Sequence, residues 1–265
     1  MSPLPPAPEF DRLRVVLVAT RNPLNIGASA RAMSNFGFLN LCVVNPYDPA
    51  FREARSAVGA SALLAGAQEF KTVAEAVADC TLVVGTTAVG RRELRHPVKR
   101  LEAGARLIRK RLASSNVALL FGSEKFGLSN EDLSHCDWLM RIPTREEHRS
   151  VNLGQAVAIC LYELARSSQA ARPPEKRKPA PAGKPTTPGK PATAGDLERI
   201  TTMLLDALRA SGSLKTRSEA VTGEKLRRLL RRHNLSATDA EFWLGMLRQI
   251  VWKLRSAKDS SSSPV

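Results

Sequence analysis

A single arginine stands among small residues in the stretch NIGASARAM (25–33), directly after the first apolar run of the chain. Asn25 can cap a helix that begins at Ile26, and Gly27 leaves the start of that helix accessible. Helix N-termini attract anions, and the guanidinium of Arg31, one turn after Gly27, can hold a phosphate through two parallel hydrogen bonds. The spacing therefore suggests a phosphate-binding helix start, although an ordinary capped helix with a surface arginine has the same spacing.

Two further polar clusters follow apolar runs later in the chain. LLFGSEKFGLSNEDL reaches the end of such a run at Gly122 and then carries Glu124, while RIPTREEHRSVNLGQ carries Ser150 and Asn152 at a helix start. Each cluster alone is also compatible with a plain strand–loop–helix connection. In open α/β sheets, however, ligands bind at the carboxyl ends of the strands. Three such clusters therefore favour one polar site that is built from separate segments.

The elements that must position these residues are strands and helices in alternation. Apolar, β-branched runs alternate with helical patterns, which predicts an α/β domain with a mainly parallel sheet. The first four runs lack polar alternation, so we expect strands that are buried on both faces. The expected strands are residues 14–19, 40–45, 81–86, 116–122 and 137–143. The expected helices lie near residues 27–37, 55–65, 72–79, 98–113, 129–135 and 152–167.

A proline-rich segment divides the chain into two domains. It holds seven prolines, six Lys or Arg and one acidic residue, so it cannot bury a core. Beyond it we expect three short helices, the first capped by Asp196 and followed by Gly212 as its C′ residue. They bury little, so we expect them to pack on the first domain or on a partner. The expected units are an α/β domain (1–170), a linker (171–195), a helical domain (196–257) and a frayed tail (258–265).

The formal net charge of +15 is concentrated in the last third of the chain, where 19 Lys and Arg residues face nine acidic ones. A basic surface of this size suits a polyanion, above all a nucleic acid, although a solubilising surface would have the same composition. In TGEKLRRLLRRHN, leucines occupy one side of a predicted helix and arginines the other. We expect this second side to bind RNA through Arg227, Arg228, Arg231 and Arg232.

Several other classes of chemistry have no signature in this sequence. The four cysteines are far apart and lack ligand spacing, so we expect no structural metal and a reducing, cytoplasmic location. No apolar run reaches 18 residues, and the first residues lack the pattern of a secretory signal, so we expect no membrane contact. The motifs GxGxxG, GxxxxGK[ST], GxSxG and HExxH are also missing.

The order of the three clusters resembles the SpoU class of the SPOUT RNA methyltransferases over residues 14–167. The matching patterns are N-x-G-x-x-x-R, then F-G-x-E-x-x-G-L-[ST], then I-P followed by S-[LV]-N-[LV]. The full first motif and the helical C-terminal domain look like the TrmJ-type group. This resemblance implies a trefoil-knot fold, a homodimer packed through the knot, and S-adenosylmethionine (SAM) as cofactor. It also implies methylation of the ribose 2′-oxygen of cytidine or uridine at tRNA position 32.

The resemblance further assigns roles to individual residues. Arg31 matches the catalytic arginine of the family, and Asn25, Glu124, Ser150 and Asn152 match its supporting polar residues. Because a guanidinium stays protonated, we expect Arg31 to clamp the target phosphate and support charge on the 2′-oxygen, not to accept its proton. The cofactor is expected against Thr86, Thr87, Ala88, Gly122, Ile142, Ser150, Val151 and Leu153.

One position departs from the family pattern. Ser123 stands where many TrmJ-type sequences have an arginine, which bears on RNA contacts and nucleotide preference. The helix that starts at Asn152 is rich in small and apolar residues, so we expect it at the dimer interface. Two alternatives remain at this stage: an rRNA 2′-O-methyltransferase, and a non-catalytic RNA-binding protein that retains the fold.

Overall fold

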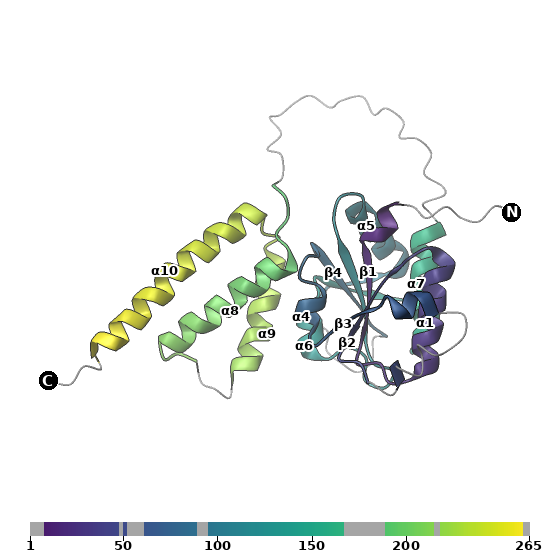
Figure 1. Ribbon diagram of the computed structural model, residues 1–265, viewed down its shortest axis with the longest axis horizontal. Coiled ribbons are helices and arrows are strands. Elements are labelled where there is room, and N and C mark those ends of the chain that lie inside the picture. Colours follow the sequence, from purple (N-terminus) through teal and green to yellow (C-terminus); the bar gives the residue numbers. More distant parts are fainter. Residues whose placement is uncertain are drawn as a thin grey trace, which may run out of the picture.

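The computed structural model describes residues 8–47, 50–51, 61–88, 95–166, 189–214 and 218–261. A parallel sheet lies between two layers of helices, and three further helices extend to one side of it (Figure 1). The strands are β1 (Leu13–Val18), β2 (Asn40–Val44), β3 (Gln68–Phe70), β4 (Leu82–Thr86), β5 (Val98–Arg100), β6 (Val117–Phe121) and β7 (Trp138–Arg141). The helices are η1 (Pro8–Arg12), α1 (Pro23–Phe36), α3 (Ser61–Ala65), α4 (Val73–Ala76), α5 (Leu101–Leu112), α6 (Asn130–Ser134), α7 (Leu153–Arg166), α8 (Ala194–Ala210), α9 (Glu219–Arg232) and α10 (Ala237–Ser261).

All five expected strands are confirmed, as β1, β2, β4, β6 and β7. The seven strands pair in the order β3-β2-β1-β6-β4-β7-β5, and every pairing is parallel. The central strand β6 is buried along its whole length, as its unbroken apolar run predicts. Two three-residue edge strands, β3 and β5, were not expected. Residues 98–100 form β5 instead of the first turn of a helix, so α5 begins at Leu101.

Two apolar layers sandwich the sheet. The larger one packs α1, α5 and α7 against one face, with Met33, Ile108 and Leu161 fully buried in it. The smaller one packs α4 and α6 against the other face. Of the helix expected at residues 55–65, the described part is α3, and the rest lies outside the described residues.

The position of β7 gives the fold its particular topology. It pairs with β4 on one side and β5 on the other, although β4 and β5 are consecutive along the chain. The chain therefore inserts β7 between two strands that it has already laid down, before α7 packs against α1 and α5. This chain order is compatible with the trefoil knot that the sequence resemblance implies, and such knots are rare exceptions among folds.

The helical region is attached directly to the α/β domain. The backbone amides of Ala194 and Gly195 donate to the carbonyls of Cys80 and Ala78, both at 2.8 Å. Helix α8 packs near α4, α9 packs on α6, and α10 lies along α8 (Figure 1). The expectation that these helices pack on the first domain is therefore confirmed. Among the described helices, none is both long and apolar enough to cross a membrane.

The first helix of this region starts earlier than expected. Thr193, not Asp196, is its N-cap, because the Thr193 side chain accepts from the Asp196 amide while the Asp196 carboxylate accepts from the Thr193 amide. Asp196 is thus the third residue of a capping box, a position that the sequence pattern did not distinguish from the cap itself. Gly212 follows the C-cap with a φ of 75°, as a C′ glycine requires.

Candidate active site

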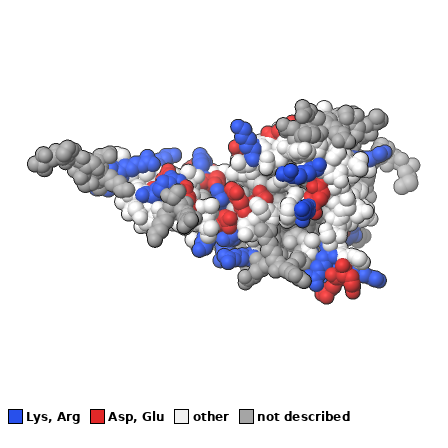
Figure 2. Space-filling view, turned by 90° about the horizontal axis from the view of Figure 1, so that it is seen from below, with Lys and Arg blue, Asp and Glu red and all other residues white. Residues whose placement is uncertain are grey.

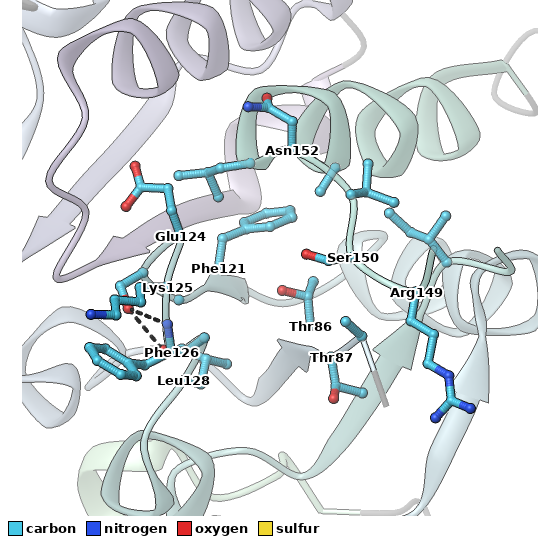
Figure 3. Close-up of a pocket in the computed structure, with 18 of the residues that line it drawn as sticks. Thr86, Thr87, Phe121, Glu124, Lys125, Phe126, Leu128, Arg149, Ser150 and Asn152 are labelled. Carbon is cyan, nitrogen blue, oxygen red and sulfur yellow. Dashed lines mark hydrogen bonds between the residues drawn. The ribbon is translucent and has the colours of Figure 1, made fainter. Parts of the chain in front are cut away.

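A cavity of about 450 Å³ opens at the carboxyl ends of β4, β6 and β7. Figure 3 shows the side chains of Thr86 and Ser150 next to each other in this cavity, with Phe121 near them. All eight residues expected at the cofactor line this cavity, together with the other three supporting polar residues, since Ser150 belongs to both sets. The eight are Thr86, Thr87, Ala88, Gly122, Ile142, Ser150, Val151 and Leu153, and the three are Asn25, Glu124 and Asn152.

The end of β4 is fixed to its neighbours by hydrogen bonds. The Thr86 hydroxyl donates to the carbonyl of Leu120 at 2.9 Å, and the Thr87 amide donates to the carbonyl of Met140 at 3.0 Å. Because these bonds tie β4 to both β6 and β7, this wall of the cavity is preformed, as small-molecule sites commonly are.

Three segments meet through one chain of side-chain hydrogen bonds. The Asn25 amide nitrogen donates to Glu124 Oε1 at 3.0 Å, and its amide oxygen accepts from Asn152 Nδ2 at 2.8 Å. Asn152 Oδ1 in turn accepts from the Gln155 amide at 3.3 Å, so it caps the start of α7. Asn25 itself is buried. The three sequence clusters are thereby joined into one rigid polar unit.

The expected N-cap role of Asn25 is wrong. Helix α1 begins at Pro23, and its cap is Asn22, whose side chain accepts from the Leu24 amide at 2.9 Å. Proline is favoured at the first helical position, which explains why the helix starts three residues before Ile26. Because Asn22 takes the capping role, both ends of the Asn25 amide are available to bind Glu124 and Asn152.

Glu124 is held in its ionised form. Partial burial would raise its pKa, but the hydrogen bond from Asn25 and those from the backbone amides of Arg21 and Asn22 outweigh this and lower the pKa below its usual value. A carboxylate with a lowered pKa and several donors is a weak base. Its geometry suits positioning of the start of α1 better than proton transfer.

Glycines allow backbones to come close around the cavity. A Cβ on Gly122 would lie 2.0 Å from the carbonyl carbon of Gly127, and a Cβ on Gly154 would lie 2.7 Å from the Cβ of Ala28. The first contact closes the loop after β6, and the second lets α7 approach α1. A Cβ on Gly27, by contrast, would meet no neighbouring atom within 4 Å, because this glycine faces open space.

Arg31 lies apart from this arrangement. Its side chain is exposed, and it is not among the residues that line the cavity. It lies two turns after Leu24 on the outer face of α1, and Leu24 is 78% exposed. The structure thus places the arginine outside the cavity of its own chain, on a surface that other molecules can reach.

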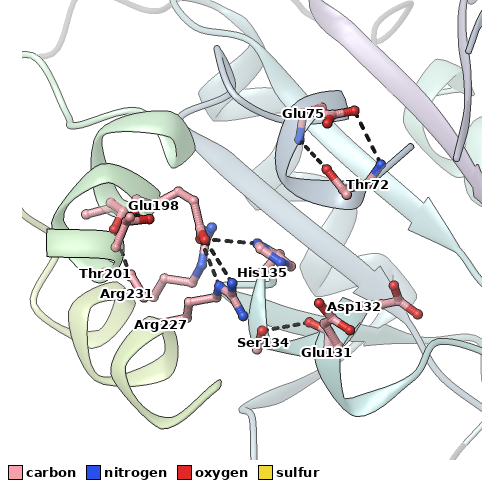
Figure 4. A network of polar contacts seen from close by, with 12 residues as sticks. Thr72, Glu75, Glu131, Asp132, Ser134, His135, Glu198, Thr201, Arg227 and Arg231 are labelled. Carbon is pink, nitrogen blue, oxygen red and sulfur yellow. Dashed lines mark hydrogen bonds and ion pairs between the residues drawn. The ribbon is translucent and has the colours of Figure 1, made fainter. Parts of the chain in front are cut away.

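The arginines of α9 are mostly engaged within the protein (Figure 4). Arg227 binds both oxygens of Glu198 at 2.8 Å, Arg228 lies 3.5 Å from Glu224, and Arg231 lies 3.3 Å from Asp137. The exposed fractions of these three side chains are 17%, 12% and 5%. Of the four arginines expected to bind RNA, only Arg232 is exposed, because acidic side chains engage the other three.

Several cavity residues were not anticipated from the sequence. The apolar ones are Phe121, Leu128, Leu133, Met140 and Ala156, which sequence patterns assign to the core. Lys125, Phe126 and Arg149 lie at the rim, and Figure 3 shows the Arg149 side chain directed away from the cavity. The rim could have been predicted from Phe126, because this aromatic residue lies between the motif residues Glu124 and Gly127.

In the described residues, no group of three or more His, Cys, Asp or Glu side chains is arranged to hold a metal ion. All four cysteines are buried and free.

Comparison with known proteins gives a consistent result. The model of the SpoU rRNA Methylase family matches residues 12–162. A protein of Sodalis glossinidius named tRNA (cytidine/uridine-2′-O-)-methyltransferase TrmJ is 34% identical over 90% of this chain and 91% of its own. A protein of the same name from Yersinia enterocolitica is 35% identical over the same shares. The crystal structure of TrmJ from Z. mobilis ZM4 covers 89% of this chain and 98% of its own at 30% identity, with a TM-score of 0.73.

Proposed function

The chain belongs to the SpoU methylase family, and from this membership we propose that it is a SAM-dependent tRNA ribose 2′-O-methyltransferase acting on cytidine or uridine at position 32 of the anticodon loop. The observation that carries the proposal is the cavity at the ends of β4, β6 and β7, which unites the three motif segments. The named substrates of the relatives from Sodalis and Yersinia, which align along nearly the whole chain, favour tRNA over rRNA.

The residues of the cavity fit SAM. A volume of about 450 Å³ lies within the range of small-molecule sites. The side chains of Phe121 and Leu153 provide apolar contacts, and the hydroxyls of Thr86 and Ser150 provide hydrogen-bonding groups. Gly122 lines the cavity, and its lack of a side chain lets the Gly127 backbone pack against it. SAM supplies an electrophilic methyl group on a sulfonium, so the protein has to orient the ribose and stabilise charge.

Arg31 and Glu124 have different roles in this proposal. The Arg31 guanidinium stays protonated, binds the phosphate beside the target ribose and stabilises negative charge that develops on the 2′-oxygen. Glu124 acts as a positioning residue, because its oxygens hold the backbone at Arg21 and Asn22 and the amide of Asn25. Neither group takes the ribose proton, since one has no free acceptor site and the other is a weak base.

A homodimer completes the site in this proposal. Arg31 is exposed and lies outside its own cavity, on the same face of α1 as the exposed Leu24. The neighbouring α7 exposes Ile159 and Tyr162, while Val157 is fully buried against its own sheet. An apolar face around an arginine suits a two-fold contact in which each protomer offers Arg31 to the cavity of the other.

The helical region contributes nonspecific contacts to tRNA phosphates in this proposal. Arg232 on α9 remains available, and α10 exposes Arg248, Lys253 and Arg255. Figure 2 shows Lys and Arg intermixed with Asp and Glu over one face of the molecule. On this face the positive charge is therefore carried by individual exposed cations and not by one uniform basic patch. A reducing, cytoplasmic location, where tRNA is modified, agrees with four free cysteines.

The proposal is tested by methyl transfer from labelled SAM to matched transcripts. We expect incorporation into a tRNA with C32 or U32, and none into the same tRNA with a 2′-deoxyribose at position 32, because that change removes only the acceptor oxygen. Incorporation into rRNA fragments but not tRNA would establish the rRNA alternative. Binding of tRNA without transfer to any RNA would establish a non-catalytic protein.

A further inference from the structure

Phe126 is a large aromatic residue displayed to solvent at the rim of the cavity. Its exposed fraction is 78%, and it lines the same cavity as Glu124 and Thr86. A phenylalanine left in water forgoes the stabilisation that burial would bring. Figure 3 shows the ring beside the Lys125 side chain, on the outer side of the cavity. An exposed ring at this position is suited to contact a ligand that enters the cavity.

The loop that carries Phe126 is held in one conformation. The Ser123 hydroxyl accepts from the Phe126 amide at 3.3 Å, and the Gly127 amide donates to the Ser123 carbonyl at 2.8 Å. Gly127 has a φ of 67°, which closes the turn, and its backbone packs directly on Gly122. A ring on such a turn loses little conformational freedom when it binds.

The chemistry of the loop matches single-stranded RNA. The Lys125 ammonium lies 5.1 Å from the centre of the Phe126 ring. An aromatic face next to a cation is the combination with which proteins stack an unpaired base and contact its phosphate. Of the other polar side chains of this turn, Ser123 is neutral and Glu124 is a carboxylate held by Asn25, so Lys125 is the cation that the turn presents.

We propose that Phe126 is a stacking platform for an unpaired base that flanks the target ribose, with Lys125 on the adjacent phosphate. The inference rests on the proposed function and adds a specificity determinant to it. It explains why an exposed aromatic ring is placed where an RNA loop would enter the cavity. A base can stack on the ring face that Lys125 leaves open.

The test uses the full-length protein and an anticodon stem-loop with 2-aminopurine at position 33. Phe126→Leu keeps an apolar side chain without a ring, and Phe126→Tyr keeps the ring. We expect wild type and Phe126→Tyr to quench the probe on binding, and Phe126→Leu not to. We also expect Phe126→Leu to raise the KM for the stem-loop by about fivefold to a hundredfold, since stacking carries that much affinity. SAM affinity should stay within about twofold of wild type, because the ring belongs to the rim.

Three results would overturn the inference. One is the absence of quenching with wild-type protein that binds the stem-loop. Another is a KM for Phe126→Leu equal to that of wild type. The last is a loss of the dimer in Phe126→Leu by sedimentation, which would make the ring a contact between protomers. A wild-type protein that quenches the probe but transfers no methyl group would overturn the proposed function and leave the stacking intact.

Discussion

The amide nitrogen of Asn25 lies 3.0 Å from Oε1 of Glu124, although 99 positions separate these residues along the chain. The other end of the same amide binds Asn152, 127 positions further on than Asn25. One buried side chain therefore joins the start of α1, the loop after β6 and the start of α7. A change at Asn25 acts on all three segments at once.

Asn25→Asp tests this junction with almost no change in shape. It puts a second carboxylate against Glu124, and like charges at this distance repel. We expect a loss of roughly 1–3 kcal/mol in the free energy of unfolding and a strong loss of methyl transfer. Denaturant unfolding at pH 8 and pH 5 measures the effect, which should shrink at the lower pH as one carboxyl takes a proton. The double variant Asn25→Asp with Glu124→Gln should recover part of the loss, and equal destabilisation of both variants would contradict the pairing.

Gly122→Ala and Gly27→Ala form a matched pair. A Cβ at Gly122 would meet backbone at 2.0 Å, whereas one at Gly27 meets nothing within 4 Å. We expect the first change to abolish SAM binding by equilibrium dialysis. The second replaces a helical glycine, so it should stabilise the protein by about 0.5–1 kcal/mol. If Gly122→Ala bound SAM normally, the close approach of the two loops would not be needed for the site.

Much of the fold could be predicted because the sequences of buried parallel strands are unbroken apolar runs. Thr86, Gly122 and Ile142 were expected at the cofactor from the resemblance to the family. They line one cavity because they lie near the ends of β4, β6 and β7, and parallel strands end at the same edge. The knot could not be read from any local pattern. The insertion of β7 between β4 and β5 could not be predicted either, because it is a property of the chain order in space.

Other features depended on partners that are distant in the sequence. Asn22 and Asn25 are the same residue type three positions apart, and only Pro23 decides which of them caps α1. Arg231 lies on the polar side of its helix by spacing, yet Asp137, 94 positions earlier, draws it into the interior. Local periodicity carries no information on such pairs.

His135 makes the contact between the two regions sensitive to acid. Burial first, and then the charges of Arg227 and Arg231, lower its pKa to about 3, although Glu198 at 3.9 Å opposes this. The unfolded chain therefore binds a proton near pH 6.5 that the folded protein excludes. Stability is full above that pH and falls below it, by at most about 1.4 kcal/mol per pH unit for this group. Thermal unfolding from pH 8 to pH 4 should show the decline, and His135→Gln should flatten it. An unchanged slope in this variant would assign the acid sensitivity to other groups.

Arg231 and Arg232 are adjacent but should behave differently. Arg231→Ala leaves Asp137 without its ion pair in a largely buried position, so we expect a destabilisation of about 3 kcal/mol. Its effect on tRNA affinity should be small under conditions in which the variant is fully folded. Arg232→Ala should leave stability unchanged, weaken tRNA binding and reduce the slope of log affinity against log salt by about 1. Filter binding at several salt concentrations separates the two, and a reduced salt slope in folded Arg231→Ala would contradict the structural role.

The last prediction concerns the subunit in which Arg31 acts. Arg31→Ala should lower the rate of methyl transfer by roughly a hundredfold or more while SAM affinity stays near wild type, because Arg31 does not line its own cavity. If Arg31 serves the partner's cavity, co-expression of Arg31→Ala with Gly122→Ala restores activity. Each mixed dimer then holds one intact cavity that faces an intact Arg31. Because random pairing makes about half of the dimers mixed, and each has one working site of two, we expect about a quarter of wild-type activity. If mixed dimers of the Arg31→Ala and Gly122→Ala subunits form but stay inactive, Arg31 acts in the site of its own chain. Arg31→Lys adds an independent check, since a lysine clamp retains part of the rate without a rise toward pH 10, whereas a lysine base would gain activity as it deprotonates.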